Sequence, residues 1–426
     1  MTDGRYSLAI VGSGIAGLTS AYLLGHRYAV TLFEAGDCLG GHTATQVVNY
    51  AERDYKIDTG FIVFNDRTYP NFIKLLARLN VAMQPTEMGF SVVDAAAGYE
   101  YAGKNLNTFF AQRKNLFKLG HWRMLRDILR FNRQATADFV GGKLTAEETL
   151  DQYLLRNRYS VEFIQHYLIP MGAAIWSSSL SEVREFSVLF FVRFFHHHGL
   201  LSLENRPQWY VVRGGSNAYI APMLAEFGGG LKLQARVEEV RRTSEGVTLR
   251  VGDGKGGSEL HSFNQVIFAC HSDQALTMLA DATAEETAIL GAIQWRNNQV
   301  VLHRDTSLLP RTRLAWSSWN YWLDKEANQL PMLTYYMNLL QGIESPVDFC
   351  VTLNDGGLIN PDLVINRYQY AHPIFSAQAH AAQARWREIN GVHNTWFTGA
   401  YWLNGFHEDG VVSALRVAEL LGVTFE

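Results

Sequence analysis

Cysteine is scarce in this chain of 426 residues. Its three cysteines, Cys38, Cys270 and Cys350, are too few and too scattered for a disulfide framework or a zinc site. This shortage favours a reducing cytosol, so we expect a cytoplasmic protein. The N-terminus also lacks a charged leader followed by an apolar run and a small-residue cleavage site, so we expect no secretory signal.

A long uncharged apolar run is also missing. The nearest candidate, 187–201, contains Arg193 and three histidines, which argues against a transmembrane helix. Charged residues make up only 18% of the chain and hydrophobic residues 47%, which argues against disorder and supplies a large core. The net charge of −4 does not indicate a nucleic-acid binder, and the length suggests two or three domains.

The chain begins with a strand, a glycine turn and a helix. Residues 6–11 are almost continuously apolar, as expected for a buried parallel strand, and the turn Gly12-Ser-Gly14-Ile-Ala-Gly17 follows at once. Gly12 permits the tight turn, Gly14 lets the backbone approach a pyrophosphate, and Gly17 lets the helix pack on the strand. The helix N-terminus, with Ile15 and Ala16, then presents N–H groups to the phosphates.

An acid follows this turn at the spacing that a ribose contact requires. A second strand, 28–33, ends at Glu34, about 20 residues after Gly12. The Glu34 carboxylate is placed to accept hydrogen bonds from a ribose, and its charge disfavours a 2′-phosphate. Strand, glycine turn, helix and acid together predict dinucleotide binding, whereas the alternative is an ordinary glycine turn.

Two further motifs indicate which dinucleotide is bound. The doublet Gly40-Gly41 and His42, after Glu34-Ala35, resembles the glycine-doublet signature of FAD enzymes related to amine oxidases and phytoene desaturases. Relatives often have arginines in this loop, and here His42 is the candidate phosphate donor. The segment Asp58-Thr-Gly60-Phe61 resembles the next landmark of that superfamily, which passes beside the flavin. The resemblance therefore implies FAD rather than NAD.

The C-terminus resembles the same superfamily in the order of its elements. A strand at 395–398 leads through a loop that begins at Gly399 to an acidic segment and a helix ending near residue 421. The resemblance implies that backbone N–H groups at Gly410 and Val411 stabilise charge at the pyrimidine end of the flavin. Many relatives carry an acid directly after the first glycine, where this chain has Ala400. Either Glu408 or Asp409 is the candidate substitute, as a ribityl or phosphate contact.

His407 lies in the same loop and would lie near the isoalloxazine if the loop follows the superfamily. It is our candidate for a catalytic acid or base. The alternative for the His407-Glu408-Asp409 cluster is contact with the cofactor alone. A second histidine group, His196-His-His198, suggests a metal site, but adjacent histidines in an extended segment point to alternating faces. We therefore expect no metal.

Narrower motifs resemble one bacterial subfamily across essentially the whole chain. The motifs lie at 194–199, 206–209, 214–216, 315–320 and 405–410. These proteins are stand-alone FAD oxidoreductases similar to the flavin domain fused to plant cyclopropane fatty-acyl phospholipid synthases. The resemblance implies desaturation of a modified fatty acyl chain of a phospholipid by hydride transfer to flavin N5. A flavin amine oxidase, or a non-catalytic flavoprotein partner of a lipid methyltransferase, are the alternatives.

The fold class expected is α/β, with a Rossmann-like FAD-binding domain of the glycine-doublet type and an inserted α+β substrate domain. We expect the FAD-binding domain to comprise 1–75, 205–275 and 392–426. The substrate domain then comprises 76–204, which reads as helical, and 276–391, which mixes strand-like stretches with a helix. In the helical part, Thr145-Ala-Glu-Glu148 fits a capping box.

The re-entry into the FAD-binding domain supplies the remaining contact. Residues 231–237 and 247–251 alternate as antiparallel strands do, and the resemblance places Val237 against the adenine through its backbone. No second dinucleotide fingerprint follows. We therefore expect the flavin to be reduced by the substrate itself.

Residues 101–135 hold a basic stripe in an acidic protein. Phenylalanine, tryptophan and leucine side chains interleave with the cations, a pattern typical of a helix that lies on an anionic bilayer. A solvated helix packed on the substrate domain is the alternative, and nucleic-acid binding lacks a supporting motif. The cations are Lys104, Arg113, Lys114, Lys118, Arg123, Arg126, Arg130 and Arg133, against one acid, Asp127. To the cytoplasmic location expected from the cysteine content, the stripe adds the inner face of the membrane as an alternative.

Overall fold

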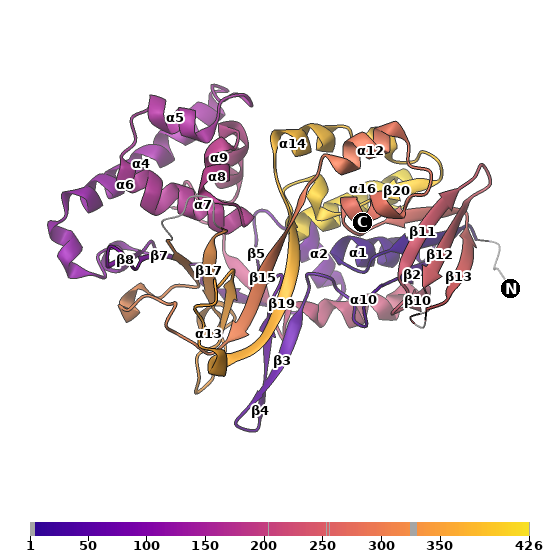
Figure 1. Cartoon of the computed structure of the whole chain (residues 1–426), viewed down its shortest axis with the longest axis horizontal. Coiled ribbons are helices and arrows are strands. Elements are labelled where there is room, and N and C mark those ends of the chain that lie inside the picture. The colour runs from indigo at the N-terminus through magenta and orange to yellow at the C-terminus, as the bar shows by residue number, and fades with distance from the viewer. Residues whose placement is uncertain (1–4, 203, 253, 255, 324–329, 426) are drawn as a thin grey trace.

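The computed structural model describes residues 5–202, 204–252, 254, 256–323 and 330–425. One half of the molecule is built on a five-stranded parallel sheet, at the right of Figure 1. In sheet order its strands are β10 (Gly230–Lys232), β2 (Ala29–Phe33), β1 (Ser7–Val11), β14 (Gln265–Phe268) and β20 (Thr395–Phe397). The strands come from all three segments expected in the FAD-binding domain.

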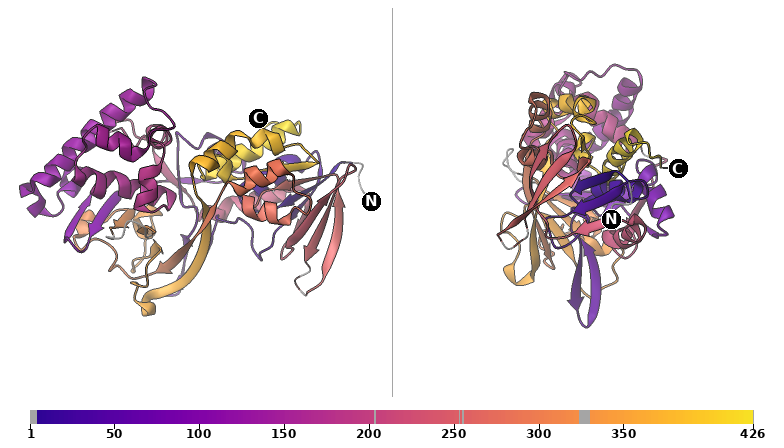
Figure 2. Two further views of the ribbon diagram at one scale, coloured as in Figure 1. Left: turned by 45° about the horizontal axis from the view of Figure 1, so that its top comes forward. Right: turned by 90° about the vertical axis from the view of Figure 1, so that its right-hand side faces the viewer.

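Helix α1 (Ile15–Leu24) is buried along its whole length. It packs between α16 (His407–Leu420) and α10 (Ile220–Phe227). A three-stranded antiparallel sheet lies at the outer end of this half. Its strands are β11 (Val237–Arg242), β12 (Val247–Gly252) and β13 (Ser258–Phe263). Figure 2 shows this sheet at one end of the molecule and the helical lobe at the other.

A seven-stranded sheet forms the centre of the second half. Its order is β19 (Val364–Pro373), β15 (Trp295–His303), β18 (Cys350–Leu353), β17 (Met332–Tyr336), β16 (Trp319–Trp322), β7 (Phe90–Asp94) and β8 (Tyr99–Ala102). The long pair β15 and β19 runs from this sheet toward the parallel sheet, as the orange and yellow strands in Figure 1 show. Sequence segments before and after the FAD-domain re-entry therefore share one sheet.

Helices cover the β7–β8 side of that sheet, at the upper left of Figure 1. Their apolar faces meet in a core that includes Phe131, Phe163 and Phe191. Within the described residues these helices are α3 (Leu106–Phe109), α4 (Leu119–Val140), α5 (Leu150–Arg156), α6 (Val161–Phe163), α7 (Ile169–Trp176), α8 (Leu180–Glu185) and α9 (Val188–His197). None of the helices that the structure describes is both long enough and apolar enough to cross a bilayer.

Smaller elements join the two halves. A hairpin of β3 (Thr45–Tyr50) and β4 (Arg53–Asp58) projects at the bottom of Figure 1, and β5 (Val63–Asn65), β9 (Trp209–Val212) and β6 (Met83–Thr86) form a small sheet. The remaining helices are α2 (Pro70–Arg78), α11 (Ser272–Met278), α12 (Ala284–Gly291), α13 (Met337–Leu340), α14 (Ala377–Ala384) and α15 (Trp386–Ile389).

Two of the domain boundaries in the structure differ from those expected from the sequence. Ile289 on α12 and Trp386 on α15 belong to the core of the parallel-sheet half, together with Leu279 and Ala382. Helix α15 also contacts β20 directly. The stretches 276–293 and 377–391, which we expected in the substrate domain, therefore pack with the FAD-binding domain, because their apolar faces are buried there.

Three local predictions were wrong. The segment 231–237 is not an antiparallel strand, because β10 pairs parallel to β2 at the sheet edge. The capping box of α5 lies one turn later than expected, at Thr149 and Gln152. The histidine run is not extended, since His196 and His197 end helix α9 and His198 caps it.

Candidate functional site

The glycine turn forms one wall of the site. Gly12 has a φ of +101°, and its N–H donates to the Phe33 carbonyl over 2.8 Å. A Cβ on Gly17 would lie 1.9 Å from the Gly12 carbonyl oxygen, so α1 packs on the turn only because residue 17 lacks a side chain. The expected role of Gly17 in helix packing thus has a direct steric basis, and Gly17 lies behind the wall rather than in it.

The glycine doublet comes back to the same turn. Gly40 forms a parallel bridge with Gly14, and its N–H donates to the Ser13 carbonyl over 3.0 Å. A Cβ on Gly41 would lie 3.2 Å from the Gly14 Cα. Two backbone segments without side chains therefore meet where α1 begins, which leaves exposed N–H groups for a phosphate.

Glu34 lies beside this turn at the end of β2. Its carboxylate accepts hydrogen bonds from the Ser13 N–H over 3.0 Å, from the Ser13 hydroxyl, and from the Gly36 N–H over 2.8 Å. These donors fix the carboxylate at the rim of the cavity that the turn lines. An acid held in this way can accept further hydrogen bonds from ribose hydroxyls.

A cavity of about 950 Å³ runs from the glycine turn into the second half of the molecule. Most of the cofactor contacts expected from the sequence line it. They are Gly12, Gly14, Ile15, Ala16, Glu34, Ala35, Gly40, Gly41, His42, Gly60, Phe61, Val237 and Gly399, together with the catalytic candidate His407.

Besides Gly17, four expected contacts lie outside the wall of this cavity. Glu408 accepts hydrogen bonds from the Asn71 and Phe72 N–H groups over 3.1 and 2.9 Å, so it holds the first turn of α2. Asp409 accepts from the Phe406 N–H over 2.8 Å and caps α16. A Cβ on Gly410 would meet Ile15 at 2.6 Å, and Val411 is fully buried. The structure thus assigns these four residues to helix placement, because α16 packs its first turn against α1 and α2.

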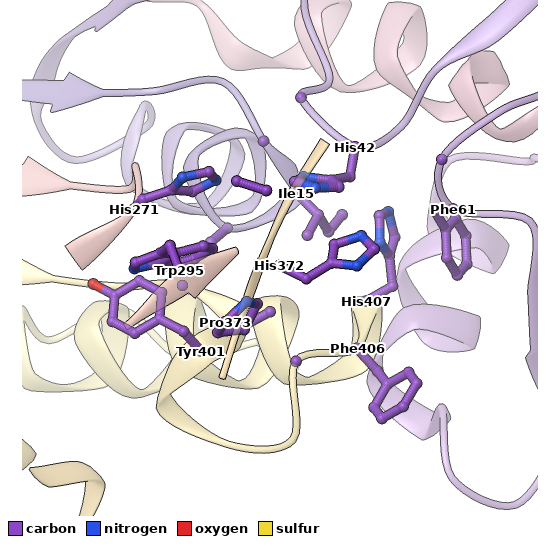
Figure 3. A pocket seen from close by; sticks show the side chains of 18 of the residues that line it. Ile15, His42, Phe61, His271, Trp295, His372, Pro373, Tyr401, Phe406 and His407 are labelled. Atoms are coloured by element: carbon purple, nitrogen blue, oxygen red, sulfur yellow. The ribbon is translucent and has the colours of Figure 1, made fainter. Parts of the chain in front are cut away.

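Three histidines that are distant in the sequence gather in the middle of the cavity (Figure 3). The His42 ring lies 5.6 Å from His372 and 6.1 Å from His271. The His271 ring in turn stacks on Trp295 at 3.8 Å. His271, Trp295 and His372 could not be predicted from the sequence, because no local motif accompanies them. The β15–β19 pair and the end of β14 bring them into the region around His42.

Burial keeps these histidines uncharged at neutral pH. It lowers the pKa of His42, and it lowers the pKa values of His271 and His372 to about 4 and about 3. The buried Nε2 of His42 has no hydrogen-bond partner within the described part of the protein. A buried polar atom of this kind is costly unless a ligand completes it. Because the other ring nitrogen of neutral His42 is the one that donates to the Ala371 carbonyl, Nε2 is an acceptor and fits an N–H or O–H group of a bound cofactor.

His407 forms another part of the wall. Its ring stacks on Phe61 at 3.6 Å, and its Nε2 lies 3.0 Å from both the Thr43 and the Tyr219 hydroxyl oxygens. Burial, with a smaller contribution from His42, lowers its pKa to about 3. These contacts favour a role in positioning the wall over a role as a proton donor, and the catalytic assignment stays a prediction.

The opposite end of the cavity is apolar. Its wall is formed by α7, α9, β7, β16 and β17, through Phe90, Met171, Ala174, Ile175, Trp176, Phe194, Trp319 and Tyr335. Among the described lining residues, the acidic and cationic side chains are Glu34, Arg236, Glu238 and Asp273, all from the half with the parallel sheet. The cavity therefore combines a polar dinucleotide end with an uncharged end.

Comparison with known families decides what this arrangement is. The sequence pattern of the family described as flavin containing amine oxidoreductase matches residues 15–294, about two thirds of the chain. The chain belongs to that family. It is an FAD-dependent oxidoreductase, and the sites around Gly14, Glu34 and His42 fit the pyrophosphate, ribose and polar edge of FAD.

Solved structures share the family fold at low sequence identity. A CLA-producing fatty acid isomerase from P. acnes superposes with a TM-score of 0.71 at 13% identity, over 98% of this chain and 99% of that one. Putrescine oxidase bound to putrescine gives 0.68 at 15% identity, over 98% and 99%. Cyclohexylamine oxidase from Brevibacterium oxydans gives 0.64 at 16% identity, over 98% and 100%. The curated proteins contain no match.

The side chains of the histidine run contact aromatic rings around the end of α9. Among the residues that the structure describes, no group of three His, Cys, Asp or Glu side chains could hold a metal ion. His196 and His197 contact the Phe139 ring, and the His198 ring stacks on Phe194 at 3.8 Å. The run therefore packs the end of α9, with His198 in the wall of the cavity.

Proposed function

We propose that this family member dehydrogenates a modified fatty acyl chain of a phospholipid. The observation that carries the proposal is the uncharged apolar end of the cavity, which suits a hydrocarbon chain. An ammonium substrate at neutral pH would have to lose its proton or its water there, because the carboxylates among the described lining residues all belong to the half with the parallel sheet. The fatty acid isomerase with the same fold supports the proposal, because its name places a lipid in a protein of this architecture.

In the proposed reaction two C–H bonds of adjacent carbons break and a C=C bond forms. One hydrogen leaves with its electron pair and the other leaves as a proton. FAD, when bound, supplies the two-electron acceptor for the hydride. The chain orients the acyl segment between α7 and β16 and excludes water from it with its aromatic wall, and the proton is released to bulk solvent.

An anaerobic titration tests the proposal. The visible absorbance of the purified holoenzyme is followed while phospholipids with methylated or unsaturated acyl chains are added in micelles. We expect the oxidised flavin spectrum to bleach and the lipid to lose two hydrogen atoms by mass spectrometry. The variant Ile175→Trp, which narrows the apolar end, should bind FAD normally and bleach at least ~10-fold more slowly.

Putrescine and cyclohexylamine serve as the second arm of the titration, because structural relatives are named for these amines. Bleaching by an amine and not by lipid would replace the proposal with amine oxidation. A flavin that stays oxidised with every donor, in a protein that co-purifies with a lipid methyltransferase, would favour a non-catalytic partner role.

A further inference from the structure

The basic stripe, residues 101–135, contains a patch of apolar side chains that face water. Phe117 is 88% exposed, Leu119 80% and Leu106 64%, and Leu116 and Trp122 are also exposed. The five side chains lie on α3, on a 3₁₀ turn (Arg113–Phe117) and on the first turn of α4. Large apolar side chains clustered in this way on a surface indicate an interaction site.

Helix α4 shows why these residues point outward. Its inner face buries His121, Met124, Ile128 and Phe131 against the helical core. The opposite face therefore presents Leu119 and Trp122 at its start, followed by Arg126 and Arg133. The inner face of α4 therefore packs on the helical core, as in the alternative of a helix packed on the substrate domain. The outer face carries both apolar and cationic side chains.

Cations surround the apolar patch. Lys114 donates to the Gly98 carbonyl over 2.9 Å, Arg113 donates to Asn107 over 2.7 Å, and Lys118 lies over the Tyr99 ring. Each of these contacts is to a neutral group, so the three charges stay available to an anion. Lys104 and Arg123 are paired with Glu87 and Glu162 at the border of the patch.

Local contacts hold the patch in one shape. The Trp122 indole N–H donates to the Leu116 carbonyl over 2.9 Å, and its ring lies 4.8 Å from Phe110. Arg113 donates to the Phe110 carbonyl over 2.9 Å and so ties α3 to the turn. The exposed side chains are thus presented by an ordered scaffold, which lowers the entropy cost of inserting them.

We propose that this surface, Leu106, Leu116, Phe117, Leu119 and Trp122 with Arg113, Lys114, Lys118, Arg126 and Arg133, docks on an anionic phospholipid bilayer. The cations attract the headgroups and the apolar side chains enter the boundary between headgroups and acyl chains. Nucleic acid would use the charge but leave Phe117 and Leu119 in water. The charge of the patch is opposite to the net charge of the chain, so the attraction is local and orients the protein.

The patch is connected to the apolar end of the cavity through the sheet. Strand β8 leads directly into α3 and pairs with β7, and β7 pairs with β16. Phe90 on β7 and Trp319 on β16 line the cavity. Docking would therefore fix the sheet that carries these lining residues relative to the lipid that the proposed reaction requires, although the docking itself goes beyond that reaction.

Vesicle flotation tests the docking directly. The holoenzyme is mixed with dimyristoyl vesicles of phosphatidylcholine alone or of phosphatidylcholine and phosphatidylglycerol in equal parts. We expect flotation with the anionic vesicles, weakening as salt is added, and little with the neutral ones. Two variants test the surface: the double variant Phe117→Ser, Leu119→Ser, and the triple variant Lys114→Gln, Lys118→Gln, Arg133→Gln. We expect each of the two to reduce vesicle binding by ~10-fold or more.

Matched controls use exposed residues of the same types elsewhere. Leu260→Ser on β13 removes an exposed leucine, and Arg53→Gln with Lys56→Gln removes two cations from the β3–β4 hairpin. Both controls should float as the wild type does. Equal flotation of patch and control variants, or a wild type that does not float with anionic vesicles, would overturn the proposal. If the protein does not bind vesicles, two other results would also overturn the proposal. One is binding of a DNA duplex, and the other is a dimer that dissociates in the patch variants.

The test is independent of the chemistry, because the vesicles carry no unsaturated or methylated chains. The flavin of the Phe117→Ser, Leu119→Ser protein is titrated with the proposed substrate in micelles as a second readout. If the variant no longer floats with vesicles but its flavin still bleaches as in the wild type, docking and oxidation are separate properties and both are supported. Flotation without any bleaching supports docking and removes the proposed reaction.

Discussion

Glu34 shows how a single side chain can be placed before its ligand arrives. Two backbone N–H groups and one hydroxyl already hold its carboxylate at the rim of the cavity, so FAD binding needs no rearrangement of this acid. The residue, its spacing and its role follow from the sequence alone. Two of the donors belong to Ser13 in the glycine turn, and the third is the N–H of Gly36, two residues after the acid.

Replacing Glu34 with Ala should weaken FAD binding. Hydrogen bonds to a charged acceptor are worth about 1.5–3 kcal/mol, so we expect at least a ~10-fold rise in the dissociation constant. Titration calorimetry of the apoprotein with FAD measures this, and Glu245→Ala, at an exposed acid outside the cavity, is the control. An unchanged affinity in the Glu34 variant would contradict the placement of the ribose site.

His407 is the residue for which sequence and structure lead to different roles. Its position in the C-terminal loop suggested an acid or base, whereas its low pKa and its contacts with Thr43 and Tyr219 indicate a fixed neutral ring. We expect His407→Gln to leave the pH dependence of flavin reduction unchanged between about pH 6 and 9, because a group with a pKa near 3 does not titrate there. Stopped-flow reduction at several pH values is the measurement, and loss of a titration limb in the variant would restore the catalytic role.

At the scale of whole elements, the α1 contact with the glycine turn depends on one missing side chain. Strand β1, the turn and α1 were predictable, because a buried parallel strand, a glycine pattern and a small-residue helix are all local signals.

The start of α5 was not predictable, because Thr145-Glu148 and Thr149-Gln152 are equivalent capping patterns. The fold selects the second, since Glu148 pairs with Arg156 and its carbonyl accepts the Val188 N–H.

Gly17→Ala should therefore disrupt the cofactor half far more than an alanine in an open helix position. The new Cβ would overlap the Gly12 carbonyl oxygen, and we expect a loss of about 3 kcal/mol in the free energy of unfolding. Gly291→Ala on α12 is the comparison, because its Cβ would meet Leu276 at an ordinary 3.7 Å. That change should be neutral or stabilise by about 0.5–1 kcal/mol. Urea unfolding of both variants checks the prediction, and similar effects would exclude the steric argument.

On the scale of the whole molecule, buried neutral histidines make the fold sensitive to acid. Burial is the first cause of the lowered pKa in each case. His121, His198, His271 and His303 fall to about 4, and His372 and His407 to about 3. An unfolded histidine takes up a proton below about pH 6.5, whereas the folded ones stay neutral until about pH 4. The stability that these groups contribute is therefore complete above pH 6.5 and is lost as pH falls toward 4.

We expect the melting temperature to fall between pH 7 and pH 5. Each such histidine costs about 2 kcal/mol at pH 5. The raised pKa values of Asp58, about 6, and Asp409, about 7, act in the opposite direction but are fewer. His303→Asn, which removes a histidine outside the cavity, should make the decline shallower. Calorimetry of the holoenzyme at several pH values measures both, and a melting temperature that is equal or higher at pH 5 would contradict the linkage.

The sequence by itself determined the cofactor half of this protein. The glycine turn, Glu34, the glycine doublet and the order of the C-terminal elements are local patterns, and each is set by backbone sterics over a few residues. The tertiary structure alone decided the rest. His271 and His372 become neighbours of His42 only when β14 pairs with β1 and β19 pairs with β15. Glu408 and Asp409 turn away from the cavity only when α16 packs on α1 and α2. Such contacts depend on burial between segments hundreds of residues apart, which no local pattern records.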